Sequence, residues 1–458
     1  MDSTLAINFF KGHPSFRLLP NEQIVKATTQ LLQDNTRDYD DDPVNRHPLT
    51  YGSNEGSLWV RDTICEFNNY KAFKFKASDK NVKSKPEYLN LTSGASYGVL
   101  NILLQCTLPH TGYTRQAFII TPTYFLINDC FFDAGFGNKL TAINEVGNDS
   151  FDLKMLEDKL IYFEEQVNVN KIEENCNDDF AVLRNPLKAE QDQKKIYRYV
   201  IYLIPTYSNP SSHTYNMETR VALIDLARKY DMLIITDDVY DLLNYNISEG
   251  QITNNEIPTP MRRLVHLDRE TNSDPISFGN TISNATFSKL IAPGLRFGYQ
   301  ESINEKLVSQ LSIGGANVSG GTPAQLNSMI VGTLLKNRLA EKILFNFIKT
   351  YKDRAAVLYT AMKLYMPEGT AFSKMNGGYF CWVKLPENYD AVAIGKLAKK
   401  EGAIVANGSD FEVVGDTRDW GKNCFRLSIS FLEREDIRKG IEILGKICKQ
   451  YRKAASIA

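Results

Sequence analysis

The stretch that decides the fold reads YVIYLIP at residues 199–205, METRVALIDLARKY at residues 217–230 and MLIIT at residues 232–236. The first and last pieces are apolar at almost every position, which predicts strands that are buried on both faces. The middle piece spaces its apolar residues as an amphipathic helix does, and Asn216 is a favourable N-cap for it. A strand, a helix and a strand in this order predict a crossover unit with two parallel strands.

Alternating strands and helices extend this unit toward both ends of the chain. Within the central helix, Val221, Ile224 and Ala227 are expected to face the sheet. The pattern predicts an α/β fold with a large doubly wound domain, in which helices cover both faces of a mostly parallel sheet. The further helices are expected at residues 97–105 and 125–134, and the further strands at residues 117–121, 139–143 and 285–288.

Two features divide the chain. A helical pattern over residues 341–365 is followed by an aromatic strand at residues 379–383, which predicts a smaller α/β lobe. The run from 164 to 195 is rich in Glu, Asp, Asn, Lys and Gln, and it predicts a solvated insertion in a surface loop. The expected domains are a large one over residues 45–335 and a small one formed by residues 1–44 with residues 336–458.

The composition excludes several classes of protein. Of the 458 residues, 43% are hydrophobic and 23% are charged, which is typical of a globular protein and not of a disordered chain, a collagen or a coiled coil. The 53 Lys and Arg residues balance the 54 Asp and Glu residues without a basic run, which argues against nucleic acid or an anionic membrane surface as the partner. No apolar run approaches the roughly 20 residues that span a bilayer. We expect a small-molecule partner.

The cysteines and the start of the chain bear on the compartment. Seven cysteines lie scattered without paired spacing, as expected of reduced thiols. No CxxC pair or histidine cluster predicts a metal site. Residues 1–4 lack the basic and apolar regions of a secretory signal. We therefore expect a cytoplasmic protein, with the nucleus and the mitochondrion left open.

Three polar residues, Asn209, Asp237 and Lys289, each come shortly after a predicted strand. The carboxyl ends of parallel strands meet at one edge of a sheet, where open α/β sheets bind ligands. An amide, a carboxylate and an amine at one site suit pyridoxal 5′-phosphate, whose aldehyde needs a lysine and whose ring nitrogen needs an acid to keep it protonated. The run TSGASYG at residues 92–98 suits its phosphate, because free amides and the dipole at a helix start favour an anion.

Three motifs of the sequence together match the pattern of a known family. They are NP at residues 209–210, DDVY at residues 237–240 and TFSKLIAPGLRFG at residues 286–298. In this order the three motifs resemble the fold-type I pyridoxal-phosphate aminotransferases of class I and II, in particular the branch of 2-aminoadipate and kynurenine aminotransferases. The resemblance extends from about residue 7 nearly to the C-terminus and is interrupted by the polar insertion. It implies an aspartate-aminotransferase-like fold.

The resemblance assigns roles around the cofactor ring. Lys289 resembles the Schiff-base lysine, which also moves the proton between the substrate Cα and the cofactor's C4′ carbon. Asp237 matches the carboxylate under the ring nitrogen. Asn209 and Tyr240 match the pair that hydrogen-bonds the phenolic oxygen, and Tyr124 matches the aromatic side chain that stacks on the ring.

The resemblance also implies where the phosphate and the substrate bind. Arg426 matches the arginine that binds the α-carboxylate, with Asn209 and Gly12 expected nearby. Tyr51 resembles a tyrosine that reaches the phosphate of a neighbouring subunit, which implies a homodimer with shared sites. The expected phosphate site comprises Gly94, the amides of Ala95 and Ser96, the hydroxyls of Thr286 and Ser288, and Arg296.

Some residues depart from the family pattern or stand beside it. The family commonly has Asn-Pro-x-Gly where this chain has NPSS at residues 209–212, so the turn after Asn209 is expected to be built differently. Six residues precede the opening segment at residues 7–14, whereas the 2-aminoadipate branch has a longer arm that helps cover the substrate side chain. Asp238 is expected to make a structural contact, and the five histidines show no ligand spacing.

These observations predict an aminotransferase that moves an amino group between an L-amino acid, 2-aminoadipate or an aromatic-like one, and a 2-oxo acid such as 2-oxoglutarate. A β-lyase or a decarboxylating enzyme of the same fold would use the same residues. A third hypothesis is a non-catalytic ligand-sensing relative of the kind fused to regulators. It is disfavoured because every catalytic position is filled and no helix-turn-helix segment precedes residue 7.

Overall fold

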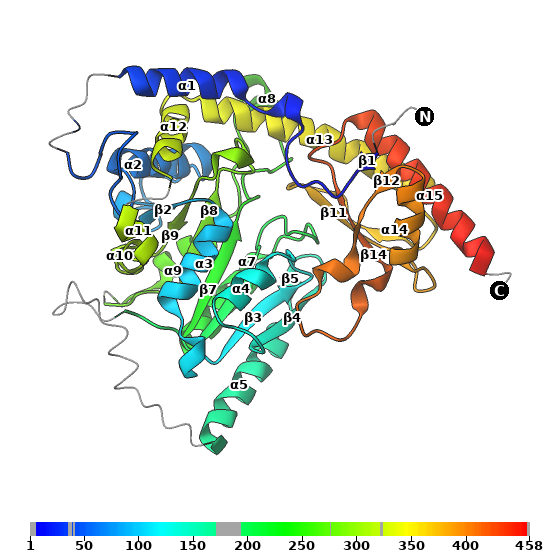
Figure 1. The fold of residues 1–458 in the computed structure, drawn as a ribbon, viewed down its shortest axis with the longest axis horizontal. Helices are drawn as coiled ribbons and strands as arrows, with labels where there is room; N and C mark the ends of the chain where they lie inside the picture. The colour runs from blue at the N-terminus through cyan, green and yellow to red at the C-terminus, as the bar shows by residue number, and fades with distance from the viewer. Residues whose placement is uncertain are drawn as a thin grey trace.

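The computed structural model describes residues 6–34, 39, 42–170, 194–274, 276–320 and 324–455. Its centre is an eight-stranded sheet in the order β2-β9-β8-β7-β6-β3-β4-β5 (Figure 1). The strands are β2 (Leu89–Thr92), β3 (Gln116–Thr121), β4 (Leu140–Val146), β5 (Ser150–Phe151), β6 (Tyr199–Leu203), β7 (Met232–Asp238), β8 (Thr281–Thr286) and β9 (Gly298–Glu301).

The predicted crossover unit is confirmed. Strands β6 and β7 pair in parallel and are buried at every position, as their apolar sequences require. Helix α7 (Met217–Lys229) connects them, and the side chain of Asn216 caps it by accepting a hydrogen bond from the amide of Thr219 at 2.8 Å. The prediction that Val221 faces the sheet is wrong, since this residue is 42% exposed and Leu223 is buried instead.

The rest of the sheet follows the predicted mostly parallel pattern, except that both edges contain antiparallel pairs, one of them between β4 and β5. The strands from β8 to β4 are parallel, but β9 pairs antiparallel with both β8 and β2. The strand predicted at residues 285–288 therefore begins and ends earlier, as Thr281–Thr286, and the chain turns back through the motif that follows it. The helices expected beside the sheet are α3 (Ala95–Cys106) and α4 (Ile127–Asp133).

A second region contains a four-stranded antiparallel sheet in the order β10-β11-β14-β13. Beside it, β1 (Ile7–Asn8) pairs in parallel with β12 (Ala403–Ile404), so a segment near the start of the chain joins its C-terminal part here. The proposed domain boundaries place both ends in the small domain, and these boundaries stay a prediction. The strands of this sheet are β10 (Ala371–Phe372), β11 (Phe380–Lys384), β13 (Ala406–Asn407) and β14 (Cys424–Ser428).

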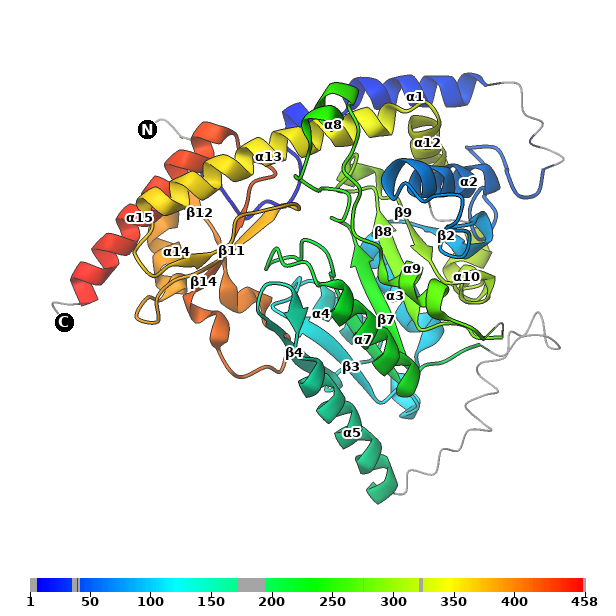
Figure 2. The same ribbon diagram turned by 180° about the vertical axis from the view of Figure 1, so that it is seen from behind.

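The long helix α13 (Leu339–Tyr365) runs from above the large sheet to α15 beside the small one (Figures 1 and 2). Its first part contacts α12, and α1 packs on α12 in turn. The remaining helices are α1 (Asn21–Gln33), α2 (Leu58–Glu66), α5 (Leu153–Asn170), α8 (Glu249–Asn254), α9 (Leu264–Thr271), α10 (Glu305–Ser312), α11 (Gly315–Gly320), α12 (Gln325–Lys336), α14 (Ala391–Lys400) and α15 (Arg434–Ala455).

The predicted surface loop at residues 164–195 is wrong at its start, because α5 continues through residue 170. Helix packing explains the difference: Glu164 pairs with Arg115 at 2.6 Å and accepts a hydrogen bond from Tyr199 at 2.9 Å. Most of the predicted insertion, residues 171–193, lies outside the described residues.

Two further sequence expectations concern the whole chain. The cysteines in the described part of the chain are free thiols, and all of them except Cys130 are buried. Among the described residues, no helix combines the length and the apolar character that crossing a membrane requires.

Candidate active site

A cavity of about 280 Å³ lies where the carboxyl ends of the parallel strands face the second region. Its walls come from distant parts of the sequence, as expected for a site at the edge of an open α/β sheet. Gly94 stands just behind this lining, and Tyr51 lies outside it. The predicted site residues that line the cavity are Gly12, Ala95, Ser96, Tyr124, Asn209, Asp237, Tyr240, Thr286, Ser288, Lys289, Arg296 and Arg426.

The buried carboxylate of Asp237 forms the floor of the cavity. Its Oδ2 accepts a hydrogen bond from the hydroxyl of Tyr202 at 2.8 Å, and its Oδ1 accepts one from Nδ2 of Asn284 at 2.9 Å. Burial raises the pKa of Asp237 to about 6, against the two hydrogen bonds, which favour the charged form. Sequence reasoning missed Tyr202 and Asn284, because both lie inside strands and not after them.

The amine of Lys289 lies above this floor, where Nζ donates a hydrogen bond to the carbonyl of Gly12 at 3.0 Å. Burial lowers the pKa of Lys289 to about 8, and the nearby Arg426 acts in the same direction. A lysine with this pKa is deprotonated to a useful extent near neutral pH. It can therefore attack a carbonyl carbon.

An anion cradle lies at the start of α3. Gly94 has φ +90°, and a Cβ at this position would lie 2.6 Å from Nη2 of Arg296, so only glycine lets the guanidinium approach. Nη1 of Arg296 donates to the hydroxyl of Ser288 at 3.2 Å, and the Thr286 hydroxyl donates to the same oxygen at 3.0 Å. A guanidinium, two hydroxyls and the first amides of a helix are the donors that a phosphate ester needs.

Arg426 enters the cavity from β14. Its Nη1 donates to Oδ1 of Asn209 at 3.1 Å, and its Nη2 donates to the carbonyl of Phe10 at 2.7 Å. The guanidinium lies 4.2 Å from the ring centroid of Phe380 and 4.9 Å from that of Phe411. Burial lowers the pKa of Arg426 to about 10, so the side chain stays charged at neutral pH. A carboxylate is the ligand that this fixed fork suits best.

Aromatic side chains line the remaining walls. Phe10 and Phe125 pack together with ring centroids 6.3 Å apart, and Tyr240 packs edge-on against Phe380 at 5.8 Å. Burial raises the pKa of Tyr124 to about 12 and that of Tyr240 well above its ordinary value. Both phenols therefore remain protonated and can donate hydrogen bonds.

The turn after Asn209 departs from the family motif in sequence but reaches a glycine-like conformation. Ser212 has φ +65°, in the left-handed region that glycine adopts readily. A neighbouring carboxylate fixes this turn, since Glu145 accepts a hydrogen bond from Ser211 at 2.8 Å and pairs with His213 at 2.9 Å. His213 therefore has a structural role in this turn.

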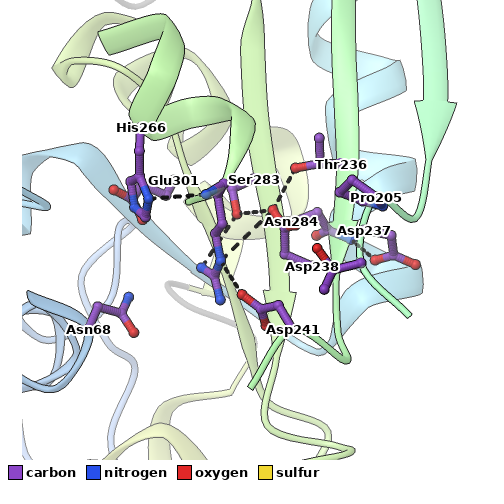
Figure 3. Close-up of polar contacts among 12 residues, drawn as sticks. Asn68, Pro205, Thr236, Asp237, Asp238, Asp241, His266, Ser283, Asn284 and Glu301 are labelled. Carbon is purple, nitrogen blue, oxygen red and sulfur yellow. Dashed lines mark hydrogen bonds and ion pairs between the residues drawn. The ribbon is translucent and has the colours of Figure 1, made fainter. Parts of the chain in front are cut away.

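Asp238 makes the structural contact that was predicted for it. Its Oδ2 accepts hydrogen bonds from the hydroxyls of Thr236 and Ser283, both at 2.6 Å. Arg263 lies 4.0 Å away and pairs more closely with Asp241 at 2.7 Å. Figure 3 shows this cluster beside Asp237, which points away from it. The side chains of Asp237 and Asp238 thus lie on opposite faces of β7, as the alternation of side chains along a strand requires.

Tyr51 is 75% exposed and does not reach the cavity of its own chain. Its predicted contact with a second subunit stays a prediction.

The comparisons with known proteins agree with this geometry. The sequence model of the family described as aminotransferase class I and II matches residues 43–444. A Saccharomyces cerevisiae protein named Uncharacterized protein YER152C is 57% identical over 447 residues, which are 97% of each chain. A 2-aminoadipate transaminase from Thermus thermophilus is 27% identical over 272 residues, 59% of this chain and 61% of its own length.

Solved structures show the same fold. A kynurenine aminotransferase from Pyrococcus horikoshii, solved in complex with PMP, has a TM-score of 0.73 at 22% identity, over 98% of this chain and 92% of its own. The predicted aspartate-aminotransferase-like α/β fold is therefore confirmed. Because the family's sequence model covers most of the chain and the fold agrees, the chain belongs to the class I and II aminotransferases.

Proposed function

We propose that the chain is an aminotransferase that moves the amino group of an L-amino acid with an aromatic side chain to a 2-oxo acid such as 2-oxoglutarate. The cofactor is pyridoxal 5′-phosphate, as membership of the family implies. The observation that carries the proposal is the set of side chains that line one cavity. A lysine with a pKa of about 8, a buried carboxylate and a buried guanidinium all line it.

The cavity offers a partner to each end of this cofactor. When bound, pyridoxal phosphate supplies an aldehyde that condenses with amines and a protonated ring that withdraws electrons. Asp237 would hold the proton on the ring nitrogen, and Tyr124 would lie against the ring face. The phosphate donors would be the amides of Ala95 and Ser96, the hydroxyls of Thr286 and Ser288, and the guanidinium of Arg296.

The remaining side chains would act on the amino acid. Arg426 binds and orients the α-carboxylate, which places the substrate Cα over the cavity floor. Nζ of Lys289 would take up the Cα proton of the amino acid and later release it, because its lowered pKa lets it exchange protons near neutral pH. Asn209 and Tyr240, which also line the cavity, would donate hydrogen bonds to the phenolic oxygen of the cofactor.

The cavity walls favour an aromatic side chain over 2-aminoadipate. Within the described residues, the only lysine and arginine side chains of the lining are Lys289, Arg296 and Arg426, and each already has a partner in the proposed scheme. The second carboxylate of 2-aminoadipate, like that of the acceptor 2-oxoglutarate, would find no further cation among the described lining residues and would enter at a desolvation cost. Phe10 and Phe125 instead offer ring faces. The Thermus thermophilus relative named 2-aminoadipate transaminase supports the second candidate donor.

A donor panel with 2-oxoglutarate as acceptor tests the proposal. Phenylalanine, tyrosine and kynurenine are expected to give kcat/KM values at least about tenfold above that of 2-aminoadipate, since an unpaired buried charge costs more than 1.4 kcal/mol. The measurement is the 2-oxo acid and glutamate formed. Faster turnover of 2-aminoadipate would contradict the aromatic preference. Formation of ammonia and pyruvate from a β-substituted donor would indicate a lyase. Binding of the cofactor without turnover of any donor would indicate a ligand-binding protein.

Arg426→Lys is expected to weaken substrate binding more than catalysis. Lysine keeps the charge but cannot form the two parallel hydrogen bonds of a guanidinium, so KM for the amino donor should rise by about 100-fold with a smaller change in kcat. Steady-state kinetics with the best donor provides the measurement. Arg418→Lys is the matched control, because Arg418 pairs with Asp416 away from the cavity. If both variants kept the same KM and kcat, Arg426 would not be the residue that binds the α-carboxylate.

A further inference from the structure

A row of buried polar side chains crosses four neighbouring strands of the large sheet. Asn90 of β2 lies opposite Gln300 of β9, Gln300 opposite Asn284 of β8, and Asn284 opposite Asp237 of β7. The first three have no exposed surface, and Asp237 is only 6% exposed. The row thus leads through the interior of the sheet to the carboxylate at the cavity floor.

Asn284 is the member of this row that contacts both the carboxylate and helix α3. Its Nδ2 donates to Oδ1 of Asp237 at 2.9 Å and to the carbonyl of Ala95 at 3.0 Å. Ala95 is the first residue of α3 and lies in the cavity wall at the proposed phosphate site. One amide group therefore joins the two places where opposite ends of the cofactor would be held. Figure 3 shows Asn284 beside Asp237 on the adjacent strand.

Helix α3 packs closely against the side chain of Asn284. A Cβ on Gly98 of α3 would lie 2.0 Å from Oδ1 of Asn284, so the helix approaches this closely only because residue 98 is glycine. Oδ1 itself is buried and has no hydrogen-bond partner among the described residues. A buried unpaired acceptor costs free energy. An apolar residue that merely filled the space would avoid this cost. The role of Asn284 therefore lies in the two hydrogen bonds that its Nδ2 donates.

We infer that Asn284 is a positioning residue that keeps the Asp237 carboxylate charged and fixes its place relative to the phosphate-binding start of α3. This inference rests on the proposed role of Asp237 at the ring nitrogen. It adds to the function a side chain that would touch neither the substrate nor the reacting atoms.

The inference predicts a loss that depends on pH. A hydrogen bond to a carboxylate stabilises its charged form, so removing Asn284 should move the pKa of Asp237 upward from about 6. At pH 6.5 a larger share of Asp237 would then be neutral and unable to pair with a protonated ring nitrogen, whereas at pH 8.5 it would remain charged. The titratable groups that interact electrostatically with Asp237, unchanged in every variant, are Asp238 on the other side of β7 and Tyr124, Cys130, Tyr202, Tyr240 and Lys289.

Gln300 provides a matched control. It lies opposite Asn284 in the sheet, and its Nε2 donates to the carbonyl of Gly98 in the same helix at 2.8 Å. It makes no contact with Asp237 in the described structure. Gln300→Met therefore removes a buried amide and a bond to α3 while leaving the carboxylate alone.

The experiment measures the dissociation constant of pyridoxamine 5′-phosphate, which carries the ring and the phosphate but no aldehyde, by calorimetry at pH 6.5 and pH 8.5. Asn284→Leu is expected to weaken binding by about tenfold at pH 6.5, the size of one hydrogen bond to a charged group, and clearly less at pH 8.5. Gln300→Met is expected to change binding by the same factor at both pH values.

Equal losses at the two pH values, or the same pH profile in Asn284→Leu and Gln300→Met, would overturn the inference. Thermal melting verifies that each variant is folded, and Asn284→Ser removes both contacts without added bulk if the leucine variant does not fold. Binding of pyridoxamine 5′-phosphate to the wild-type protein distinguishes a failure of the proposed function from a failure of the role of Asn284. If the wild type binds no pyridoxamine 5′-phosphate at all, the proposed function fails, whereas binding without a pH-dependent loss in the variants contradicts only the role of Asn284.

Discussion

Lys289→Ala is expected to lower kcat for amino transfer by at least about a thousandfold, because the variant loses both the amine that would carry the cofactor and the base that would move the Cα proton. The Nζ atom reaches the cavity from the turn after β8 and has its pKa lowered to about 8 by burial. Single-turnover formation of the 2-oxo acid measures this loss. Borohydride reduction followed by mass spectrometry should attach the cofactor to the Lys289 peptide of the wild type and to no lysine of the variant.

Lys139→Ala is the control for this change. Lys139 is also partly buried and also has a pKa lowered by burial, but its Nζ donates to the carbonyls of Pro109 and Thr114 outside the cavity. This variant should keep the wild-type rate and lose at most some stability. Wild-type turnover by Lys289→Ala, or labelling of another lysine in the wild type, would contradict the assignment of Lys289.

Asp237→Asn is expected to reduce kcat by about a hundredfold or more while the shape of the side chain is kept. A neutral amide cannot hold the proton on the ring nitrogen, so the ring withdraws electrons less well when the Cα proton leaves. The exchange of deuterium at the substrate Cα measures this step separately from turnover. It should slow by a similar factor.

Asp238→Asn makes the same change at the next residue. Its carboxylate accepts hydrogen bonds from Thr236 and Ser283 and lies near Arg263, on the other side of β7. We expect a lower melting temperature with little change in cofactor affinity, because a buried network loses a charge. If Asp237→Asn exchanged deuterium at the wild-type rate, Asp237 would not be the partner of the ring nitrogen.

The sequence predicts the centre of this protein well because local rules and the tertiary structure agree there. Strands β6 and β7 are apolar on both faces, and a parallel sheet covered by helices is the arrangement that buries both. The site residues could be found for the same reason. Asn209, Asp237 and Lys289 follow strands whose carboxyl ends share one edge, and the cavity contains all three.

Features that depend on packing between distant segments could not be predicted. Tyr202 and Asn284 contact Asp237 only through the register of β6, β7 and β8, and their own strands show no sign of a ligand. The continuation of α5 into a polar run depends on the pairing of Glu164 with Arg115, which is distant in sequence. The antiparallel strand β9 is likewise set by the turn that carries Arg296 and not by its own composition.

We propose above that the cavity around Lys289 transfers an amino group from an amino acid to the protein-bound cofactor. The most direct measurement mixes the cofactor-loaded protein with phenylalanine in the absence of any 2-oxo acid and quantifies the products per active site. We expect one equivalent of the 2-oxo acid, no ammonia, and one equivalent of glutamate when 2-oxoglutarate is then added. Release of ammonia, or the absence of any 2-oxo acid with every donor of the panel, would contradict it.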